Sequence, residues 1–419
     1  MSPTRDSFPQ AASGSRNSLN RFEFLHAPAG LDYICGMMKP FYGSNLKLGV
    51  LGGGQLGRML LTPAIRYDIH VAVLDPNPDA PCSKLAPSFT TGDFGDYDTV
   101  LNFGADCDVV TVEIEHVNTK ALRALQDRGV KVFPQPEVLE TVQDKGLQKE
   151  FYRDRGIPTA PFRLVENKSE VMASADFLPF VQKLRKGGYD GRGVQVMRTE
   201  SDLEKAFDAP SVLEQFIDFE KEIAVLTARN EAGDMVVYPP CEMVFNPEAN
   251  LVEFLSSPAQ IAPDVIANLE DTARKTTEAY GITGLLAIEF FKTLEGEIYV
   301  NEVAPRPHNS GHHTIEANVT SQYEQHLRAI LGMPLGNPEQ LRLAAMVNLL
   351  GAEDHEGPVH YEGLEEILRL PEVYVHLYGK STTKPFRKMG HVTATAGSHR
   401  EAAARAVMAR DTLKVKTRK

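Results

Sequence analysis

The chain is poor in the features that mark membrane-spanning, disulfide-linked and nucleic-acid-binding proteins. It contains no hydrophobic run long enough to span a bilayer. Its four cysteines lie far apart, without metal-ligand or disulfide-framework spacing, as a reducing compartment permits, so we expect a cytoplasmic protein. Positive charge is also scarce. The 44 Lys and Arg against 56 Asp and Glu leave a formal net charge of −12, which argues against a general affinity for nucleic acid.

The composition that remains is typical of a globular protein with several domains. With 419 residues, 42% hydrophobic and 24% charged, the chain can bury two or three cores. Residues 1–37 differ from the rest, because they are rich in Ser, Pro, Arg and Asn and lack sustained periodicity. Asp6 and Glu23 weaken the alternative of a targeting peptide. Since Met38 opens the ordinary start MKPFYGSNLKLGVLGG, we expect residues 1–37 to be a disordered or non-native extension.

A glycine-rich turn follows the first predicted strand. LKLGVLGG (46–53) predicts a buried strand, the next residues predict a helix, and IHVAVLD predicts a second strand ending at Asp75. Gly52, Gly54 and Gly57 fit G-x-G-x-x-G, with an acidic residue about 20 positions later, as in dinucleotide-binding units. This pattern supports an NAD-dependent dehydrogenase as an alternative function. The motif alone is weak, because the same turn serves any ligand with a phosphate at a helix N-terminus.

Two acidic residues, Glu113 and Glu115, come near the end of the next predicted strand, DVVTVEIEHV (108–117). Open α/β sheets bind ligands at the carboxyl ends of their strands, so both residues are candidates for ligand contact. The alternative is that they are alternate residues of an edge strand.

A second glycine-rich segment, FVQKLRKGGYDGRGVQVMR (180–198), predicts a hairpin. A strand rather than a helix follows the glycines, which excludes a Walker loop. Glycines let the backbone approach a polyphosphate closely, and Lys183 on the preceding strand can reach phosphate oxygens. The alternative is a surface hairpin without a ligand. Further on, Glu214 and Glu222 flank a polar crossing between two strands, at a spacing suited to an adenine edge and a ribose diol.

The most informative pair of residues is Glu289 and Glu302. LLAIEFFKTLEGEIYVNEVA (285–304) predicts two strands, and a turn centred on Glu295 and Gly296 places the two carboxylates opposite each other. Opposed residues have Cβ atoms roughly 4.5–5.5 Å apart. Carboxylates that close repel unless a proton or a cation lies between them, and Mg²⁺ is the natural occupant. Replacing Glu302 by Gln is therefore expected to relieve repulsion in the metal-free protein.

The order of these motifs resembles the ATP-grasp superfamily. Within it, the chain is similar to the N5-carboxyaminoimidazole ribonucleotide synthetase family from about Leu48 to His391. The stretches that carry the resemblance are GVLGGGQLGRM, TVEIEHV, VQDKGLQKE, GGYDGRG, EQFIDFEKEIAV and NEVAPRPHNSGHHT. The related formate-dependent glycinamide ribonucleotide transformylases have a PRPHDTG-type signature where this chain has PRPHNSG.

The resemblance implies an ATP-grasp fold, α/β and α+β, in three parts. It places a doubly wound α/β domain at residues 38–140, the ATP-grasp domain at residues 141–335 and a small β-rich domain at residues 336–419. It also implies a homodimer.

The implied reaction is the carboxylation of 5-aminoimidazole ribonucleotide with ATP and bicarbonate, through carboxyphosphate, in purine biosynthesis. Mg²⁺, with Mn²⁺ as an alternative, would bind at Glu289 and Glu302. ATP contacts are assigned to Lys145, Lys183, Gly188, Gly191, Gly193, Glu214, Gln215, Ile217, Glu222 and Asn301. Catalytic roles are assigned to Tyr189, Asp190, Arg192, His308 and Asn309. A catalytically inactive nucleotide-binding regulator is the other alternative.

The aminoimidazole substrate would lie between the first and last domains. The resemblance assigns its contacts to Gln55, Leu56, Glu115, Asp190, Arg192, Lys380 and Arg387. The last two belong to a basic cluster in HLYGKSTTKPFRKMGHVT and would hold the 5′-phosphate. The chain has KPFRK where RPGRK is more common, so that Phe386 replaces a glycine and the local backbone geometry is in question.

Overall fold

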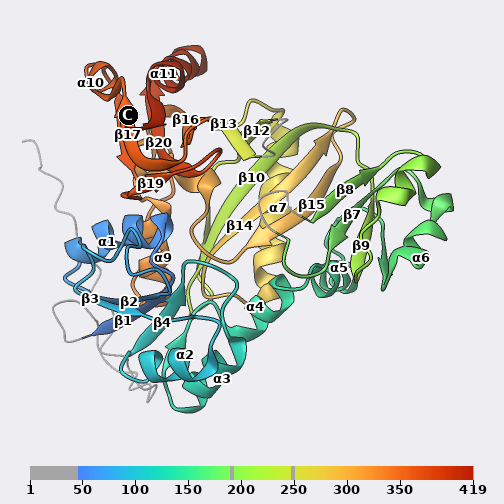
Figure 1. The fold of residues 1–419 in the computed structure, drawn as a ribbon, viewed down its shortest axis with the longest axis horizontal. Helices are drawn as coiled ribbons and strands as arrows, with labels where there is room; N and C mark the ends of the chain where they lie inside the picture. The colour runs from blue at the N-terminus through green and yellow to red at the C-terminus, as the bar shows by residue number, and fades with distance from the viewer. Residues whose placement is uncertain (1–45, 189–192, 247–250, 419) are drawn as a thin grey trace, which may run out of the picture. The chain divides into compact units, whose positions relative to one another are not determined.

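The N-terminal part is a parallel sheet with helices on its faces (Figure 1). The computed structural model describes residues 46–188, 193–246 and 251–418. The strand order β3-β2-β1-β4-β5 runs outward in both directions from β1, as in doubly wound folds. Its elements are β1 (Lys47–Leu51), α1 (Gln55–Arg66), β2 (His70–Asp75), β3 (Ser88–Thr91), α2 (Tyr97–Gly104), β4 (Val109–Val112), α3 (Thr119–Asp127) and β5 (Lys131–Val132).

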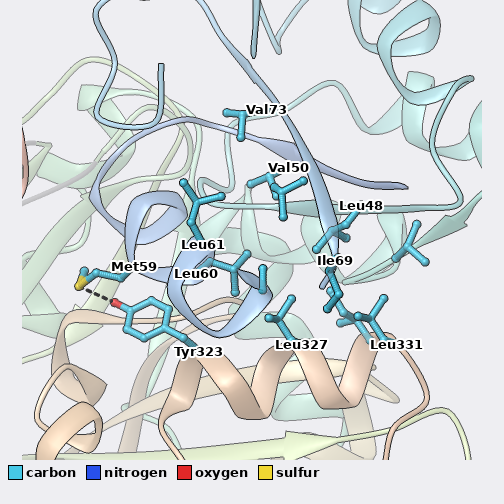
Figure 2. Close-up of a cluster of buried hydrophobic side chains, with 14 of the residues drawn as sticks. Leu48, Val50, Met59, Leu60, Leu61, Ile69, Val73, Tyr323, Leu327 and Leu331 are labelled. Carbon is cyan, nitrogen blue, oxygen red and sulfur yellow. Dashed lines mark hydrogen bonds between the residues drawn. The ribbon is translucent and has the colours of Figure 1, made fainter. Parts of the chain in front are cut away.

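Helix α1 fixes this sheet to the central part of the molecule. Its apolar face packs on one side against β1 and β2 and on the other against α9 (Gln322–Ile330), as Figure 2 shows. Leu60, Leu327 and Ile330 are at most 3% exposed in this cluster. The hydroxyl of Tyr323 donates to the sulfur of Met59 at 3.4 Å. Since the cluster joins residues more than 250 positions apart, the glycine turn before α1 is held firmly against the ATP-grasp part.

A small antiparallel sheet and a large one form the centre of the molecule. The small sheet has the order β6-β9-β7-β8 and the large one begins β15-β14-β10-β12-β13. The first part of this region comprises α4 (Pro136–Val142), α5 (Lys145–Asp154), β6 (Phe162–Val165), α6 (Lys168–Met172), β7 (Phe180–Leu184), β8 (Val194–Met197) and β9 (Ser211–Gln215). The second comprises β10 (Phe219–Arg229), β11 (Met235–Val237), β12 (Cys241–Asn246), β13 (Leu251–Ser257), α7 (Pro263–Tyr280), β14 (Gly284–Thr293), β15 (Ile298–Ala304) and α8 (Thr314–Ala317).

The C-terminal strands continue the large sheet. β16 (Leu343–Leu350) pairs with β13, and β20 and β18 follow it, so one nine-stranded sheet runs through both parts. A three-stranded sheet of order β19-β17-β21 and helix α11 complete this end (Figure 1). The remaining elements are β17 (Gly357–Glu362), α10 (Leu364–Ile367), β18 (Val373–Leu377), β19 (Thr382–Thr383), β20 (Lys388–Ala396), α11 (His399–Thr412) and β21 (Lys414–Thr417).

The predicted order of parts is confirmed: a parallel α/β domain precedes a centre of two antiparallel sheets and a β-rich end. The prediction for residues 1–37 falls outside the described residues. Within the described part of the chain, no helix is long and apolar enough to cross a membrane.

Candidate active site

Two opposed carboxylates lie on adjacent strands of the large sheet. Glu289 on β14 pairs with Glu302 on β15, as predicted, whereas the pairs nearer the turn are shifted by one residue from the predicted register. The next pair is Phe290 with Val300, so Asn301 is an extra residue in a β-bulge. A bulge turns two successive side chains toward the same side of a strand. Asn301 and Glu302 can therefore both face the site, which a regular strand would not allow.

The environment of the two carboxylates separates their pKa values. Burial and the charge of Glu302 raise the pKa of Glu289. The ammonium of Lys145, whose Nζ lies 2.7 Å from Oε2 of Glu302, holds the pKa of Glu302 low. Without a cation, Glu289 therefore carries the proton and Glu302 the negative charge. A cation beside Glu289 would take the place of this proton and favour the charged form of both carboxylates.

Helix α5 brings two lysines to this hairpin. Asp144 caps its first turn by accepting from the backbone N–H groups of Gly146 and Leu147 at 2.9 and 3.3 Å. Lys145 is thus the first helical residue, and Lys149 lies four residues later on the same face. Arg185, just beyond β7, donates to both carboxylate oxygens of Asp144 at 2.9 and 3.0 Å, which ties the glycine-rich hairpin to the start of α5.

A row of three buried charges connects α5 with the small sheet. Glu214 on β9 is 3% exposed, and its Oε2 and Oε1 lie 2.9 Å from Nζ of Lys149 and 3.1 Å from Nζ of Lys183. Lys183 on β7 also donates to Oδ1 of Asn301 at 2.8 Å. Both oxygens of Glu214 are therefore engaged by lysines, a role that was not expected for this residue.

The glycine-rich segment is a hairpin, as predicted: β7 and β8 are antiparallel, with Lys183 opposite Val194. Gly188 and Gly193 lie on its two sides, and Gly193 has a φ of +75°. Tyr189, Asp190, Gly191 and Arg192 fall outside the described residues, so their assigned roles stay predictions.

Glu222 lies on the same sheet face as Glu289. On β10, Ala224 is opposite Glu289, and Glu222 is two residues away along the strand. Burial raises the pKa of Glu222 to about 7. Gln215, which is exposed, ends β9 opposite Phe180, and the half-buried Ile217 lies in the crossing between β9 and β10.

His308 begins the polar segment that follows β15. Its Nε2 lies 3.6 Å from Oε1 of Glu289, while its Nδ1 accepts from the backbone N–H of Ser310 at 3.4 Å. Nδ1 also lies 2.9 Å from the hydroxyl of Ser310, and a neutral ring that accepts from Ser310 at Nδ1 carries its proton on Nε2, which faces the carboxylates. Burial lowers the pKa of His308 to about 3, so the ring is neutral near pH 7. Beside it, Nδ2 of Asn309 is buried without a hydrogen-bond partner among the described residues.

The glycine turn before α1 is filled by the chain itself. Glu113 follows β4 and accepts from the N–H groups of Gly54 at 3.1 Å and Leu56 at 3.0 Å. A Cβ atom at Gly54 would overlap the carboxylate. Asp75 accepts from Gly53 N–H at 2.7 Å. The place that a dinucleotide pyrophosphate would take at this helix N-terminus is therefore occupied, which argues against the dehydrogenase alternative.

The edge-strand explanation for Glu113 and Glu115 is wrong, because β4 lies between β1 and β5 and ends at Val112. Beyond this end, Oε1 of Glu115 lies 2.8 Å from Nη2 of Arg306. This ion pair links the N-terminal domain to the segment after β15. Gln55 begins α1 nearby.

The C-terminal basic cluster lies near both the carboxylate pair and helix α1. Nζ of Lys380 donates to the carbonyl of Lys388 at 2.6 Å, and Arg387 donates to the carbonyl of Thr382 at 2.8 Å. The charge of Lys388 lowers the pKa values of Glu289 and His308, which places it within electrostatic reach of the carboxylates. From α1, Nη1 of Arg58 reaches within 2.6 Å of where a Cβ of Gly379 would lie.

Comparison with known proteins agrees with this arrangement. The ATP-grasp domain matches residues 150–323, the ribonucleotide synthetase preATP-grasp domain residues 46–143, and the phosphoribosylaminoimidazole carboxylase C-terminal domain residues 344–405. The structure of N5-carboxyaminoimidazole ribonucleotide synthetase from Thermotoga maritima is 41% identical, with a TM-score of 0.82, and covers 89% of this chain and 100% of its own. The chain belongs to the N5-carboxyaminoimidazole ribonucleotide synthetase family.

Two further members of this family are informative. A synthase from Aspergillus clavatus, solved with ADP and 5-aminoimidazole ribonucleotide, is 33% identical with a TM-score of 0.79, over 87% of this chain and 98% of its own. A phosphoribosylaminoimidazole carboxylase from Ogataea methanolica is 37% identical over 84% of this chain. The chain spans only 66% of the length of that longer carboxylase.

Sequence reasoning missed several residues that shape the site. Lys149 sits one helical turn after a predicted phosphate-binding lysine, and this spacing was a usable signal. Glu113 was noticed only as a ligand candidate, although the adjoining glycine turn offers the N–H groups that it accepts from. Arg306 lies in the PRPHNSG stretch and Lys388 in the basic cluster, but neither was assigned a role, because the sequence does not show which acidic residues lie near them.

Proposed function

We propose that this protein carboxylates 5-aminoimidazole ribonucleotide with ATP and bicarbonate to give N5-carboxyaminoimidazole ribonucleotide, as an ATP-dependent carbon–nitrogen ligase. The observation that carries the proposal is the opposed pair Glu289 and Glu302, with Lys145 and Lys183 beside it. Paired carboxylates next to lysines suit a metal-bound polyphosphate. The family membership supports the choice of substrates.

The carboxylate pair fits a hard divalent cation such as Mg²⁺, with Mn²⁺ as the alternative. Glu289 and Glu302 offer oxygen ligands, and burial together with the charge of Glu302 raises the pKa of Glu289, so that a cation there would take the place of its proton. A bound Mg²⁺ would neutralise phosphate charge.

The lysines and the glycine-rich hairpin would hold the nucleotide. Lys145 and Lys183 lie beside the carboxylates and would contact phosphate oxygens, with the backbone of Gly188, Gly191 and Gly193 close to the same groups. Asn301 faces Lys183 from the bulge. Adenine would lie at the crossing segment, near Glu214, Gln215 and Ile217, and Glu222 would accept from the ribose hydroxyls.

Carboxylation needs an activated form of bicarbonate, because hydroxide is a poor leaving group. Transfer of the γ-phosphoryl group of ATP to a bicarbonate oxygen gives ADP and carboxyphosphate. The exocyclic amine of the substrate then attacks the carboxyl carbon, and phosphate leaves as the amine loses a proton. The neutral ring of His308 would donate from Nε2 to the bicarbonate, and Nδ2 of Asn309 offers a second donor. Tyr189, Asp190 and Arg192 would cover the intermediate.

The aminoimidazole nucleotide would lie between α1 and the C-terminal cluster. Lys380 and Arg387 would bind the 5′-phosphate, and Gln55, Leu56 and Glu115 would contact the remainder. Because the N–H of Leu56 donates to Glu113, the Leu56 contact would involve its other atoms. We further propose a cytoplasmic homodimer that acts on these small molecules and does not bind nucleic acid.

The decisive experiment is phosphate release from ATP measured with each substrate omitted in turn. Release that requires both bicarbonate and 5-aminoimidazole ribonucleotide, with ¹³C from labelled bicarbonate in the product, is the expected result. ATP binding without turnover would favour the inactive regulator. Binding of NAD at micromolar concentration would revive the dehydrogenase.

A further inference from the structure

We propose that Lys149 is a positioning residue. It holds the β15 bulge at Asn301 through hydrogen bonds, and it keeps Lys183 in place through Glu214. The expected effect of Lys149 on turnover rests on the proposed function. Lys149 is 1% exposed, and the contacts of its ammonium group are with the protein itself. Its side chain is more deeply buried than those of Lys145 and Lys183, which are 22% and 13% exposed and lie beside the carboxylate pair.

The first part of the evidence is the support of the bulge. An extra residue interrupts the regular ladder of a strand, so its backbone groups need other partners. Nζ of Lys149 donates to the carbonyl of Asn301 at 3.4 Å and to the hydroxyl of Thr159 at 2.7 Å. The hydroxyl of Thr159 donates in turn to the carbonyl of Val300 at 2.8 Å. Lys149 and Thr159 together hold the carbonyl groups of Val300 and Asn301, the two residues that precede Glu302.

The second part is the row of charges. Glu214 is shared between Lys149 at 2.9 Å and Lys183 at 3.1 Å, all three being largely buried. A buried carboxylate that loses one of two cationic partners binds the other more strongly. Without Lys149, Glu214 would draw Lys183 away from Asn301 and from the nucleotide phosphates. The same substitution would also release the bulge that aims Glu302.

The test compares Lys149→Met with Lys275→Met, a matched control at an exposed helical lysine whose side chain is 69% exposed. Calorimetric titration with ADP and Mg²⁺ measures the nucleotide Kd, and phosphate release measures kcat. We expect Lys149→Met to weaken nucleotide binding and to lower kcat by about tenfold or more each, because charge-assisted contacts are displaced. Lys275→Met should change neither. Lys149→Arg, which keeps the charge, should recover part of the nucleotide affinity.

Thr159→Val keeps the protein testable if Lys149→Met does not fold. It removes only the hydroxyl between Lys149 and Val300 and leaves all three charges in place. We expect kcat to fall severalfold while the nucleotide Kd changes less. A merely structural lysine would lower the melting temperature and leave Kd and kcat of the folded protein unchanged, and that result in either variant overturns the inference. If the wild type shows no bicarbonate-dependent turnover, the proposed function fails, and the Kd values still decide the role of Lys149.

Discussion

At the scale of single residues, Glu289 and Glu302 are not equivalent. The sequence predicts that Glu302→Gln relieves repulsion between the two carboxylates in the metal-free protein. In the structure, Lys145 compensates Glu302, whereas burial and Glu302 itself raise the pKa of Glu289. Loss of charge at Glu302 would leave Lys145 without its partner, so the substitution that relieves strain is at Glu289.

We therefore predict that Glu289→Gln stabilises the metal-free protein, and more so as the pH rises. The folded-state pKa of Glu289 is about 8 against an ordinary value of 4.5, so the folded protein binds a proton that the unfolded chain has lost. The stability of the wild type should fall between these pH values through this group, and that of the variant should not. The difference should reach on the order of a few kcal/mol near pH 8, measured by thermal unfolding in EDTA.

Glu302→Gln is the matched comparison. Because the pKa of Glu302 is lowered to about 2 by Lys145, the charged form stabilises the fold above pH 4.5, and its loss should destabilise the protein at pH 7. Both variants should lose phosphoryl transfer. A stability difference between Glu289→Gln and wild type that stays constant from pH 5 to pH 8.5 would contradict the assigned protonation.

Arg387 tests the second half of the site. Arg387→Ala should raise the KM for 5-aminoimidazole ribonucleotide by roughly 10- to 100-fold, since a charge-assisted phosphate contact contributes about 1.5–3 kcal/mol. The KM for ATP should change little. Steady-state kinetics with each substrate varied separately measures both values. Arg369→Ala, at an exposed position of the same domain, is the control. Equal losses for both substrates would mean that Arg387 supports the fold instead.

At the scale of elements, the turn before β20 keeps a glycine-like backbone conformation at Phe386. Phe386 stands where the resemblance to the family leads us to expect glycine, and its φ is +59°, in the left-handed region. The backbone therefore keeps the conformation that glycine adopts easily. Its N–H donates to the carbonyl of Gly351 at 2.9 Å, which helps to hold the turn. For a residue with a Cβ atom, this conformation costs about 1–2 kcal/mol.

We predict that Phe386→Gly stabilises the protein by roughly 0.5–1 kcal/mol. The free energy gained by relieving the strained φ should exceed the entropic cost that glycine adds by making the unfolded chain more flexible. Urea unfolding monitored by circular dichroism measures the change. Phe386→Ala keeps the strain and removes the ring, so it should not be stabilising. If the glycine variant is less stable than wild type by as much as the alanine variant, packing of the ring outweighs the backbone strain.

The sequence predicted the elements better than the contacts between them. The opposition of Glu289 and Glu302 was predicted, but the register near the turn was not, because Phe291 pairs with Tyr299 instead of Val300. The bulge at Asn301 was not predictable, because one extra residue in a strand leaves no compositional mark. Likewise, Glu214 looked like a ligand contact until its burial against Lys149 and Lys183 was seen, since tertiary packing decides which charges meet.

At the scale of the whole molecule, the family and the three-part fold were confirmed, but the separation of the last two parts was less complete than the sequence suggested. Strand β16 pairs with β13 on one side and β20 on the other, so the ATP-grasp sheet has no edge where the C-terminal part begins. A domain boundary within a hydrogen-bonded sheet cannot open without breaking a strand pair. We therefore expect the two parts to unfold together.

Val392→Ala tests this cooperativity. Val392 lies on β20, is 0% exposed and is opposite both Val347 and Val375. Its truncation should lower the free energy of unfolding by roughly 1–3 kcal/mol. The melting temperature of the nucleotide-binding part, followed by nucleotide protection, should fall together with that of the whole protein, followed by circular dichroism. Val196→Ala on β8, 40% exposed, is the control. Two separated transitions would show that the parts unfold independently.

The turn before α1 behaves as a receptor whose ligand is part of the same chain. Glu113 is tethered to the N–H groups that it occupies, so it competes at an effective concentration that dissolved anions do not reach. Free phosphates in a cell should therefore not inhibit the protein at this turn. In this chain, the acidic residue after the fourth strand of the domain thus distinguishes the glycine turn from an open phosphate site.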